Sequence, residues 1–113
     1  MPRFAILDHD HPFRHWDFLL EAGSALRTWR LLEEPLRGQA IRAEPLPDHR
    51  LLYLDYEGPV SGGRGRVLRW DAGTFAWEQD TDDQVRVRLR ATRIDGAVVL
   101  HRTPDGRWTW EWD

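Results

Sequence analysis

Hydrophobic and polar residues alternate along much of this chain, most clearly between residues 15 and 21. Successive side chains of a β-strand point to opposite faces, so residues two apart share a face. One face of this segment is apolar, with Trp16, Phe18 and Leu20. The other face carries His15, Asp17, Leu19 and Glu21. The pattern predicts a strand that is anchored in a core and projects His15 and Asp17 together from its polar side.

Similar short segments recur along the chain, separated by turn-forming residues. The segment 40–44 is predicted to end at Pro45 and Pro47, and Asp71-Ala72-Gly73 is predicted to form a hairpin turn. In the segment 48–58, strand periodicity would place His49, Leu51 and Tyr53 on one face. Further strands are expected at 3–7, 26–31, 66–70, 74–78, 85–91, 97–102 and 107–113, with a polar loop at 79–84.

About nine short strands without a long helix indicate a mainly β fold, either a compact antiparallel barrel or a sandwich. Two histidine-bearing strands facing one side favour the barrel, with a polar pocket on that side. The arginines of 85–91 are expected on a solvated face rather than along a nucleic-acid track. The tryptophans of 107–113 are expected in the core rather than as a platform for base stacking.

Length and composition limit the number of domains and the classes of protein to which this chain could belong. The 113 residues suit one domain, 1–113, and the absence of cysteine excludes disulfides, thiolate metal sites and thiol chemistry. No apolar run reaches the roughly 20 residues of a membrane-spanning helix, and the N-terminus lacks a signal-peptide pattern, so the expected location is cytoplasmic. A net charge of −3 provides no global basic field for nucleic acid. All 16 basic residues are arginine, as a GC-rich genome would produce, although arginine also suits phosphate.

His9, His15 and Asp17 are candidate ligands for a divalent metal. Imidazole suits several transition metals, and carboxylate suits harder ions such as manganese. The alternative is that His15 and Asp17 form only a hydrogen-bonded pair at a sheet edge. The glycine-rich loop at 59–65 could let backbone approach a ligand, or could be an ordinary connection.

The combination of motifs resembles the 3′-phosphoesterase module of bacterial DNA ligase D, which also occurs as a free-standing protein. The resemblance spans nearly the whole chain. It is carried by His9-x5-His15-Trp16-Asp17-Phe18, Leu26-x2-Trp29, Asp48-His49-x3-Tyr53-x2-Tyr56-Glu57-Gly58, Gly65-x-Val67-x2-Trp70-Asp71-x-Gly73-Thr74 and Asp95-Gly96-x3-Leu100-x-Arg102.

The resemblance implies an eight-stranded β-barrel with a manganese-dependent site that removes a 3′-terminal ribonucleotide and then a 3′-phosphate from DNA. Carried over by position, the metal ligands are His9, His15 and Asp17, and the catalytic pair is His49 and Tyr53. His11 is not expected to be a ligand, since the family has no histidine there. The implied partners are DNA 3′ ends and a DNA ligase or polymerase/Ku end-joining system, with no membrane.

Three positions depart from the family pattern. A phosphate-gripping arginine of the family falls at Leu19, which should border the cavity, a lysine falls at Glu33, and a second arginine falls at Ile41. Arg30 and Arg42 are therefore the predicted phosphate-binding residues. These departures keep two other hypotheses open: a non-catalytic β-barrel that binds nucleic acid or a repair protein and retains a residual metal site, and a phosphoesterase with a small-molecule substrate.

Overall fold

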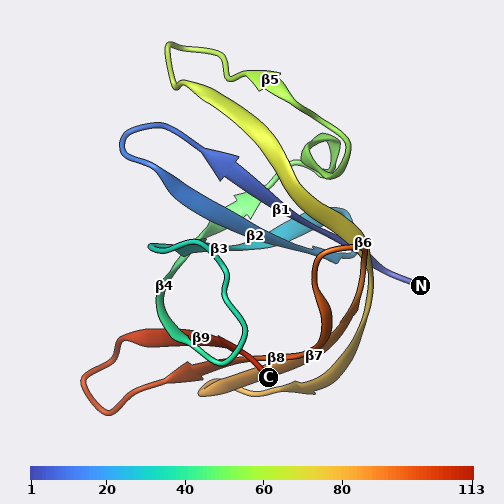
Figure 1. Ribbon diagram of the computed structural model, residues 1–113, viewed down its shortest axis with the longest axis vertical. Helices are drawn as coiled ribbons and strands as arrows, with labels where there is room; N and C mark the ends of the chain where they lie inside the picture. The colour runs from blue at the N-terminus through green and yellow to red at the C-terminus, as the bar shows by residue number, and fades with distance from the viewer.

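The computed structural model describes residues 1–113 as nine strands and one short 3-10 helix (Figure 1). The strands are β1 (Arg3–His9), β2 (His15–Ala22), β3 (Ala25–Leu31), β4 (Ala40–His49), β5 (Gly58–Pro59), β6 (Arg66–Asp80), β7 (Gln84–Arg90), β8 (Asp95–Arg102) and β9 (Trp108–Trp112), and the helix is η1 (Leu51–Leu54). No helix is long and apolar enough to cross a membrane.

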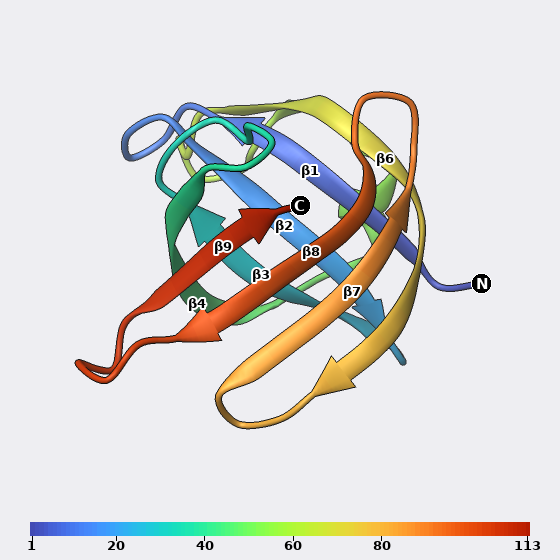
Figure 2. The same ribbon diagram turned by 60° about the horizontal axis from the view of Figure 1, so that its bottom comes forward.

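All nine strands belong to a single antiparallel sheet that curls back on itself. Its order is β1-β2-β3-β4-β9-β8-β7-β6-β5, and β1 also pairs with β6 (Figure 2). That extra pairing closes a ring, and the two-residue β5 is attached to the outer end of β6. The predicted fold class, mainly β with a compact antiparallel arrangement, is confirmed.

The main core fills the interior of the ring. β1 and β2 supply Phe4, Ile6, Trp16, Phe18 and Leu20 to it, and they meet apolar side chains of β7, β8 and β9. The three tryptophans of the C-terminal strand also belong here, as predicted: Trp110 and Trp112 are buried and Trp108 packs against the cluster. The arginines of β7 point outward, as predicted, and Arg86 and Arg88 both pair with Glu78.

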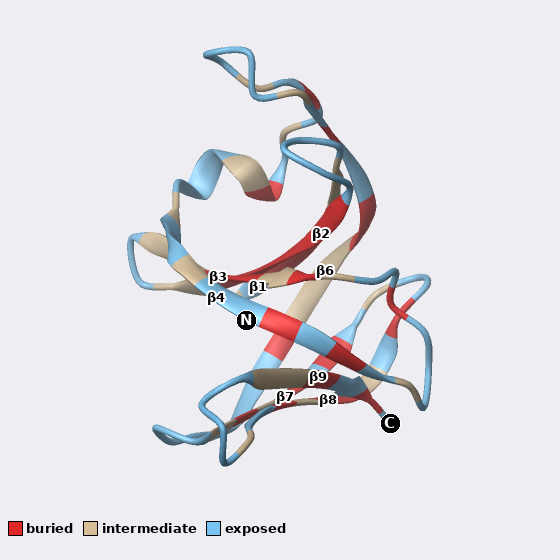
Figure 3. Cartoon of the chain, turned by 90° about the vertical axis from the view of Figure 1, so that its left-hand side faces the viewer, coloured by how far each residue is buried: buried red, intermediate tan, exposed pale blue.

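A second, smaller cluster covers the opposite face of β1 and β2. It contains Ala5, Leu7, Leu19, Leu26, Leu54 and Val67. Leu54 comes from η1, which lies on the side of β1–β3 away from the layer of β7, β8 and β9 (Figure 3). Because both faces are covered, β2 is buried along most of its length. The polar side of β2 is therefore an internal surface between the sheet and η1.

The predicted limits of β4 were wrong. The strand continues through Pro45 and Pro47 to His49, and the next residues form η1 instead of a strand. β9 pairs only with residues 40–43 of β4, so the later half has a free edge. A proline lacks an N–H but costs no ladder bond on a free edge, which is why these prolines do not end the strand.

The predicted hairpin turn at Asp71-Ala72-Gly73 was also wrong, because β6 runs straight through it to Asp80. Asp71 is buried, and its carboxylate accepts hydrogen bonds from the backbone N–H groups of Arg93 and Ile94 at 2.7 and 2.9 Å. A Cβ atom at Gly73 would lie 2.0 Å from the Arg90 carbonyl oxygen. These turn-forming residues thus serve contacts between distant segments.

Candidate metal centre

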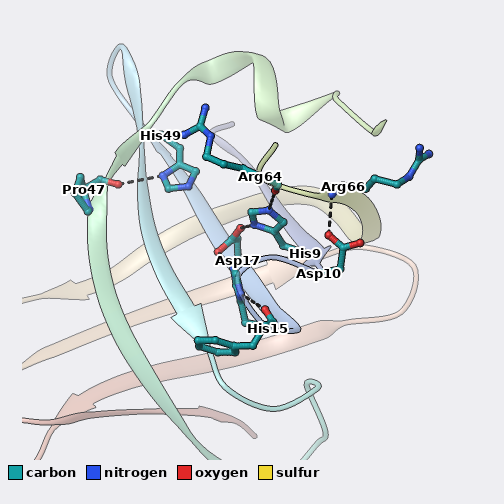
Figure 4. A network of polar contacts seen from close by, with 9 residues as sticks. His9, Asp10, His15, Asp17, Pro47, His49, Arg64 and Arg66 are labelled. Carbon is teal, nitrogen blue, oxygen red and sulfur yellow. Dashed lines mark hydrogen bonds and ion pairs between the residues drawn. The ribbon is translucent and has the colours of Figure 1, made fainter. Parts of the chain in front are cut away.

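The β1–β2 hairpin brings the three predicted metal ligands together. His9 ends β1 and pairs directly with His15, which begins β2, and Asp17 follows two residues later. All three side chains lie on the face that carries the second cluster (Figure 4). One ligand atom from each side chain can be chosen so that all three lie within 4.8 Å of one another.

Asp17 is the centre of this arrangement. Its Oδ2 lies 3.3 Å from Nδ1 of His9, and its Oδ1 lies 3.0 Å from Nε2 of His15. The contact to His15 is short but is not aligned as a hydrogen bond, so the buried Oδ1 has no hydrogen-bond partner. The two imidazole rings stand edge to face with centroids 4.8 Å apart.

Backbone carbonyl groups fix the orientation of both imidazoles. Nδ1 of His15 lies 2.9 Å from the Phe13 carbonyl oxygen, and Nε2 of His9 lies 2.8 Å from that of Arg64. A carbonyl oxygen only accepts, so each of these ring nitrogens carries a proton. In the neutral rings, the remaining nitrogens then present lone pairs toward Asp17. Such outer hydrogen bonds are typical of metal-binding histidines, and the donor set fits a divalent cation.

The charges of the cluster are coupled. Burial alone would raise the pKa of the Asp17 carboxyl, but its close contacts with the imidazoles of His15 and His9 outweigh burial and lower the pKa to about 2. The hydrogen bond with Asp17 in turn raises the pKa of His9 above its ordinary value. The raised pKa means that the buried carboxylate favours a proton on His9. A metal ion would compete with this proton for Nδ1 of His9, the ring nitrogen that faces Asp17.

A cavity of about 340 Å³ opens beside the cluster, and it also contains the predicted catalytic pair. His9, Asp17, His49 and Tyr53 all line it. The rings of His49 and Tyr53 stand edge to face with centroids 6.0 Å apart. Nδ1 of His49 donates to the Pro47 carbonyl oxygen at 3.0 Å, which leaves Nε2 free.

A β-bulge determines which way His49 faces. In the β3–β4 ladder, Thr28 lies opposite Leu46 and Leu26 lies opposite His49. Two residues of β3 thus span the same distance as three residues of β4. The extra residue lies at Pro47 or Asp48. It reverses the alternation and puts His49 on the face of Leu26 and Asp17. Strand periodicity had grouped His49 with Leu51 and Tyr53. His49 and Tyr53 do line the same cavity and Leu51 does not, and their proximity comes from this bulge and the turn of η1.

The predicted phosphate-binding arginines lie outside this cavity. Arg30 of β3 lies directly opposite Asp17 of β2 in the strand register, so the two side chains are on the same face of the sheet. Its guanidinium lies 3.8 Å from Glu44 and over the Phe13 ring at 5.3 Å. Arg42 lines a separate cavity of about 330 Å³ together with Arg107 and Trp108.

The structure shows where the three residues that depart from the family pattern lie. Leu19 is fully buried in the second cluster and does not line the cavity, so the expectation that it borders the cavity was wrong. Ile41 is fully buried in the main core. Glu33 lies at the surface and accepts a hydrogen bond from Gln39.

Two arginines that sequence reasoning missed do line the cavity, namely Arg50 and Arg64. The sequence held a signal for Arg64, because it lies in the glycine-rich loop noted for its capacity to approach a ligand. Arg50 directly follows the candidate His49. Their convergence depends on the β1–β6 pairing, which no local pattern reveals.

Comparison with known proteins identifies the family of this chain. Residues 7–102 match the family model described as the DNA ligase D 3′-phosphoesterase domain. The chain is 34% identical over 117 residues to the multifunctional non-homologous end joining DNA repair protein LigD of Mycobacterium tuberculosis (strain ATCC 25618 / H37Rv), a match that covers 93% of this chain and 15% of the relative. It is 29% identical over 111 residues to the multifunctional non-homologous end joining protein LigD of Pseudomonas aeruginosa, covering 94% of this chain and 13% of the relative. The chain thus spans only a small part of these relatives' length. It belongs to the DNA ligase D 3′-phosphoesterase domain family.

Proposed function

We propose that this protein is a metal-dependent phosphoesterase that processes DNA 3′ ends in repair, removing a 3′-terminal ribonucleotide and a 3′-phosphate. Family membership supports the reaction class. The observation that carries the proposal is the convergence of His9, His15 and Asp17 at the cavity that holds His49 and Tyr53.

His9, His15 and Asp17 would hold the metal, for which Mn²⁺ is the expected ion. When bound, a divalent metal supplies Lewis-acid stabilisation of the charge that develops on phosphate oxygens. The protein contributes two imidazoles whose orientation is set by the Phe13 and Arg64 carbonyl oxygens. Their ring planes therefore need little rearrangement on binding.

His49 and Tyr53 would act on the phosphate from the other wall of the cavity. With Nδ1 bound to Pro47, His49 offers Nε2 for proton transfer or for a hydrogen bond to a phosphate oxygen. The Tyr53 hydroxyl can donate a second hydrogen bond to developing negative charge. The edge-to-face contact of the two rings fixes their relative orientation.

Arg30 and Arg42 would bind phosphate groups of the DNA strand outside the cavity. Arg30 is the nearer, since it lies directly across from Asp17 in the sheet. Arg42 and Glu44 follow on the same face of the neighbouring strand, beside the turn that precedes β9. A guanidinium suits phosphate because its planar fork can donate two hydrogen bonds at once.

The alternative is a non-catalytic barrel that binds DNA or a repair protein and retains a residual metal site. Leu19 and Ile41 favour it, because apolar, fully buried side chains occupy two positions where the family has phosphate-binding arginines. Cooperation with a ligase or with a polymerase/Ku end-joining system is likewise a proposal. It rests on relatives of which the chain covers 15% or less.

The test is an assay on a primer–template that ends in one ribonucleotide or in a 3′-phosphate. The proposal expects conversion to a 3′-hydroxyl end with Mn²⁺ and none with EDTA. His49→Ala should slow conversion about a hundredfold if His49 transfers a proton. His101→Ala, an exposed histidine on β8, is the matched control and should leave the rate unchanged. Absence of product from both substrates at any metal concentration would favour the binding module.

A further inference from the structure

The candidate cavity contains two arginines that no carboxylate neutralises. Arg50 and Arg64 both line it, whereas most other arginines of the protein are paired with an acidic side chain, as Arg86 and Arg88 are with Glu78. The only acidic side chains of the lining are Asp17, which interacts with the two histidines, and the exposed Asp48. The cavity that holds the candidate metal ligands therefore also contains two arginines without an ion-pair partner.

The loop that carries Arg64 is held close to the metal cluster. His9 donates from Nε2 to the Arg64 carbonyl oxygen at 2.8 Å, and Asp10 accepts from the Arg66 N–H at 2.8 Å. Gly65, with φ +74°, lies between them, and a Cβ atom there would come within 2.1 Å of Asp10 Oδ1. This close approach requires glycine at position 65. The position of Arg64 is thus tied to the residue that would bind the metal.

The side chain of Arg64 is directed along the cavity. Nε donates to the Ser61 carbonyl oxygen at 2.8 Å and Nη2 contacts Ser61 Oγ at 3.3 Å, so Nη1 remains without a protein partner. In Figure 4 the guanidinium extends toward His49, while the side chain of Arg66 points away from the cavity. The Ser61 contacts reduce the number of conformations that the side chain would lose on binding an anion.

We propose that Arg64, assisted by Arg50, binds the terminal phosphate inside the cavity. Arg64 would then take the place of the phosphate-binding arginine that the family has at the position of Leu19. The inference rests on the proposed function for the identity of the anion, a phosphate monoester or diester. Arg64 grips this phosphate from the β5–β6 loop, and Arg30 contacts the strand from the β3 side. The site thus recovers the missing charge from a different segment of the fold.

Binding of inorganic phosphate to the metal-free protein tests the grip separately from catalysis. Titration calorimetry should show that Arg64→Ala weakens phosphate affinity at least about fivefold, because charge-assisted hydrogen bonds are lost. Arg66→Ala is the matched control, since it removes an arginine two residues away that does not line the cavity. It should change the affinity less than twofold. Circular dichroism and the thermal midpoint should show that both variants remain folded.

Three results would overturn the proposal: no phosphate binding by the wild type, unchanged affinity in Arg64→Ala, or an equal loss in Arg66→Ala. The 3′-phosphate assay with Mn²⁺ separates this outcome from a failure of the proposed function. A wild type that binds phosphate through Arg64 but processes no DNA end would leave the grip standing and refute the enzyme. An active wild type whose Arg64→Ala variant keeps full activity and affinity would refute the grip alone.

Discussion

A single carboxylate, Asp17, organises the candidate metal centre. It is buried, it contacts two histidines, and its Oδ1 has no aligned hydrogen-bond donor. A buried anion is costly unless it is compensated. In the metal-free protein the two imidazoles that contact Asp17 offset part of this cost, and in the metal-bound protein the ion would do so. The same three residues can therefore serve both states.

Metal affinity should depend on His15 and be independent of His11. His15→Ala removes one of the three converging ligands, whereas His11 is exposed and lies outside the cluster. Calorimetric titration with Mn²⁺ should show a loss of at least about a hundredfold for His15→Ala and less than twofold for His11→Ala. A large loss in His11→Ala would show that the wrong histidine has been assigned.

The stability of the metal-free protein should report the lowered pKa of Asp17. The folded-state pKa of about 2 lies below the ordinary 3.8, so the ionised carboxylate stabilises the fold above pH 4, and this contribution disappears as the pH falls toward 2. The shift corresponds to about 2 kcal/mol. Asp17→Asn lacks this titration. Urea unfolding from pH 5 to pH 2 should show the wild-type advantage over Asp17→Asn shrinking by that amount, and a constant difference would contradict the account.

Arg30 provides a test of the external phosphate contact. Arg30→Ala should slow 3′-end processing at least about tenfold, equivalent to roughly 1.4 kcal/mol of transition-state stabilisation. Mn²⁺ affinity should not change. Arg42→Ala is the natural comparison, because Arg42 lies farther from Asp17 and lines another cavity, and its effect should be smaller. A larger effect at Arg42 would reverse the assignment.

At the scale of single elements, two mispredictions have physical causes. Pro45 and Pro47 ordinarily end a strand, but β4 has a free edge where they lie. Asp71 and Gly73 ordinarily form a turn, but here they make contacts with the segment around Arg90 to Ile94. Both errors arise because the partner of a residue, which decides its role, is distant in the sequence.

The role of Gly73 can be measured directly. Gly73→Ala would force a Cβ atom to within 2.0 Å of the Arg90 backbone oxygen, which cannot move without disturbing the β6–β7 pairing. The free energy of unfolding should fall by at least about 2 kcal/mol. Gly106→Ala meets no atom within 4 Å and changes only a left-handed glycine at φ +85°, so it should cost about 1 kcal/mol. Equal losses in denaturant unfolding would argue against the close contact.

The bulge in β4 is a further element that sequence periodicity could not reveal. Alternation alone would have placed His49 and Leu46 on different faces of the sheet. Only the register with β3 shows the added residue. By contrast, the alternation of residues 15–21 correctly predicted the faces of β2. His15 and Asp17 share one face, and Trp16 and Phe18 occupy the main core.

At the scale of the whole molecule, the site lies where the closed sheet meets η1 and the β5–β6 loop. The hairpin contributes the candidate metal ligands, β4 and η1 contribute His49 and Tyr53, and the loop contributes Arg64. Only the hairpin part is local in sequence. Alternation predicted that His15 and Asp17 share a face, and the family resemblance selected His9, His15 and Asp17 as the metal ligands. The cavity arginines could not be identified beforehand, because Arg50 lies before η1, Arg64 lies in the β5–β6 loop, and the β1–β6 pairing brings that loop to the site.

The most direct test of the metal centre is an anomalous-scattering map from crystals of this protein soaked in MnCl₂. We predict one strong manganese peak bound by Nδ1 of His9, Nε2 of His15 and the Asp17 carboxylate, and loss of that peak in His15→Ala crystals. A wild-type map without a peak at these three residues, or with its only peak elsewhere on the surface, would contradict this prediction.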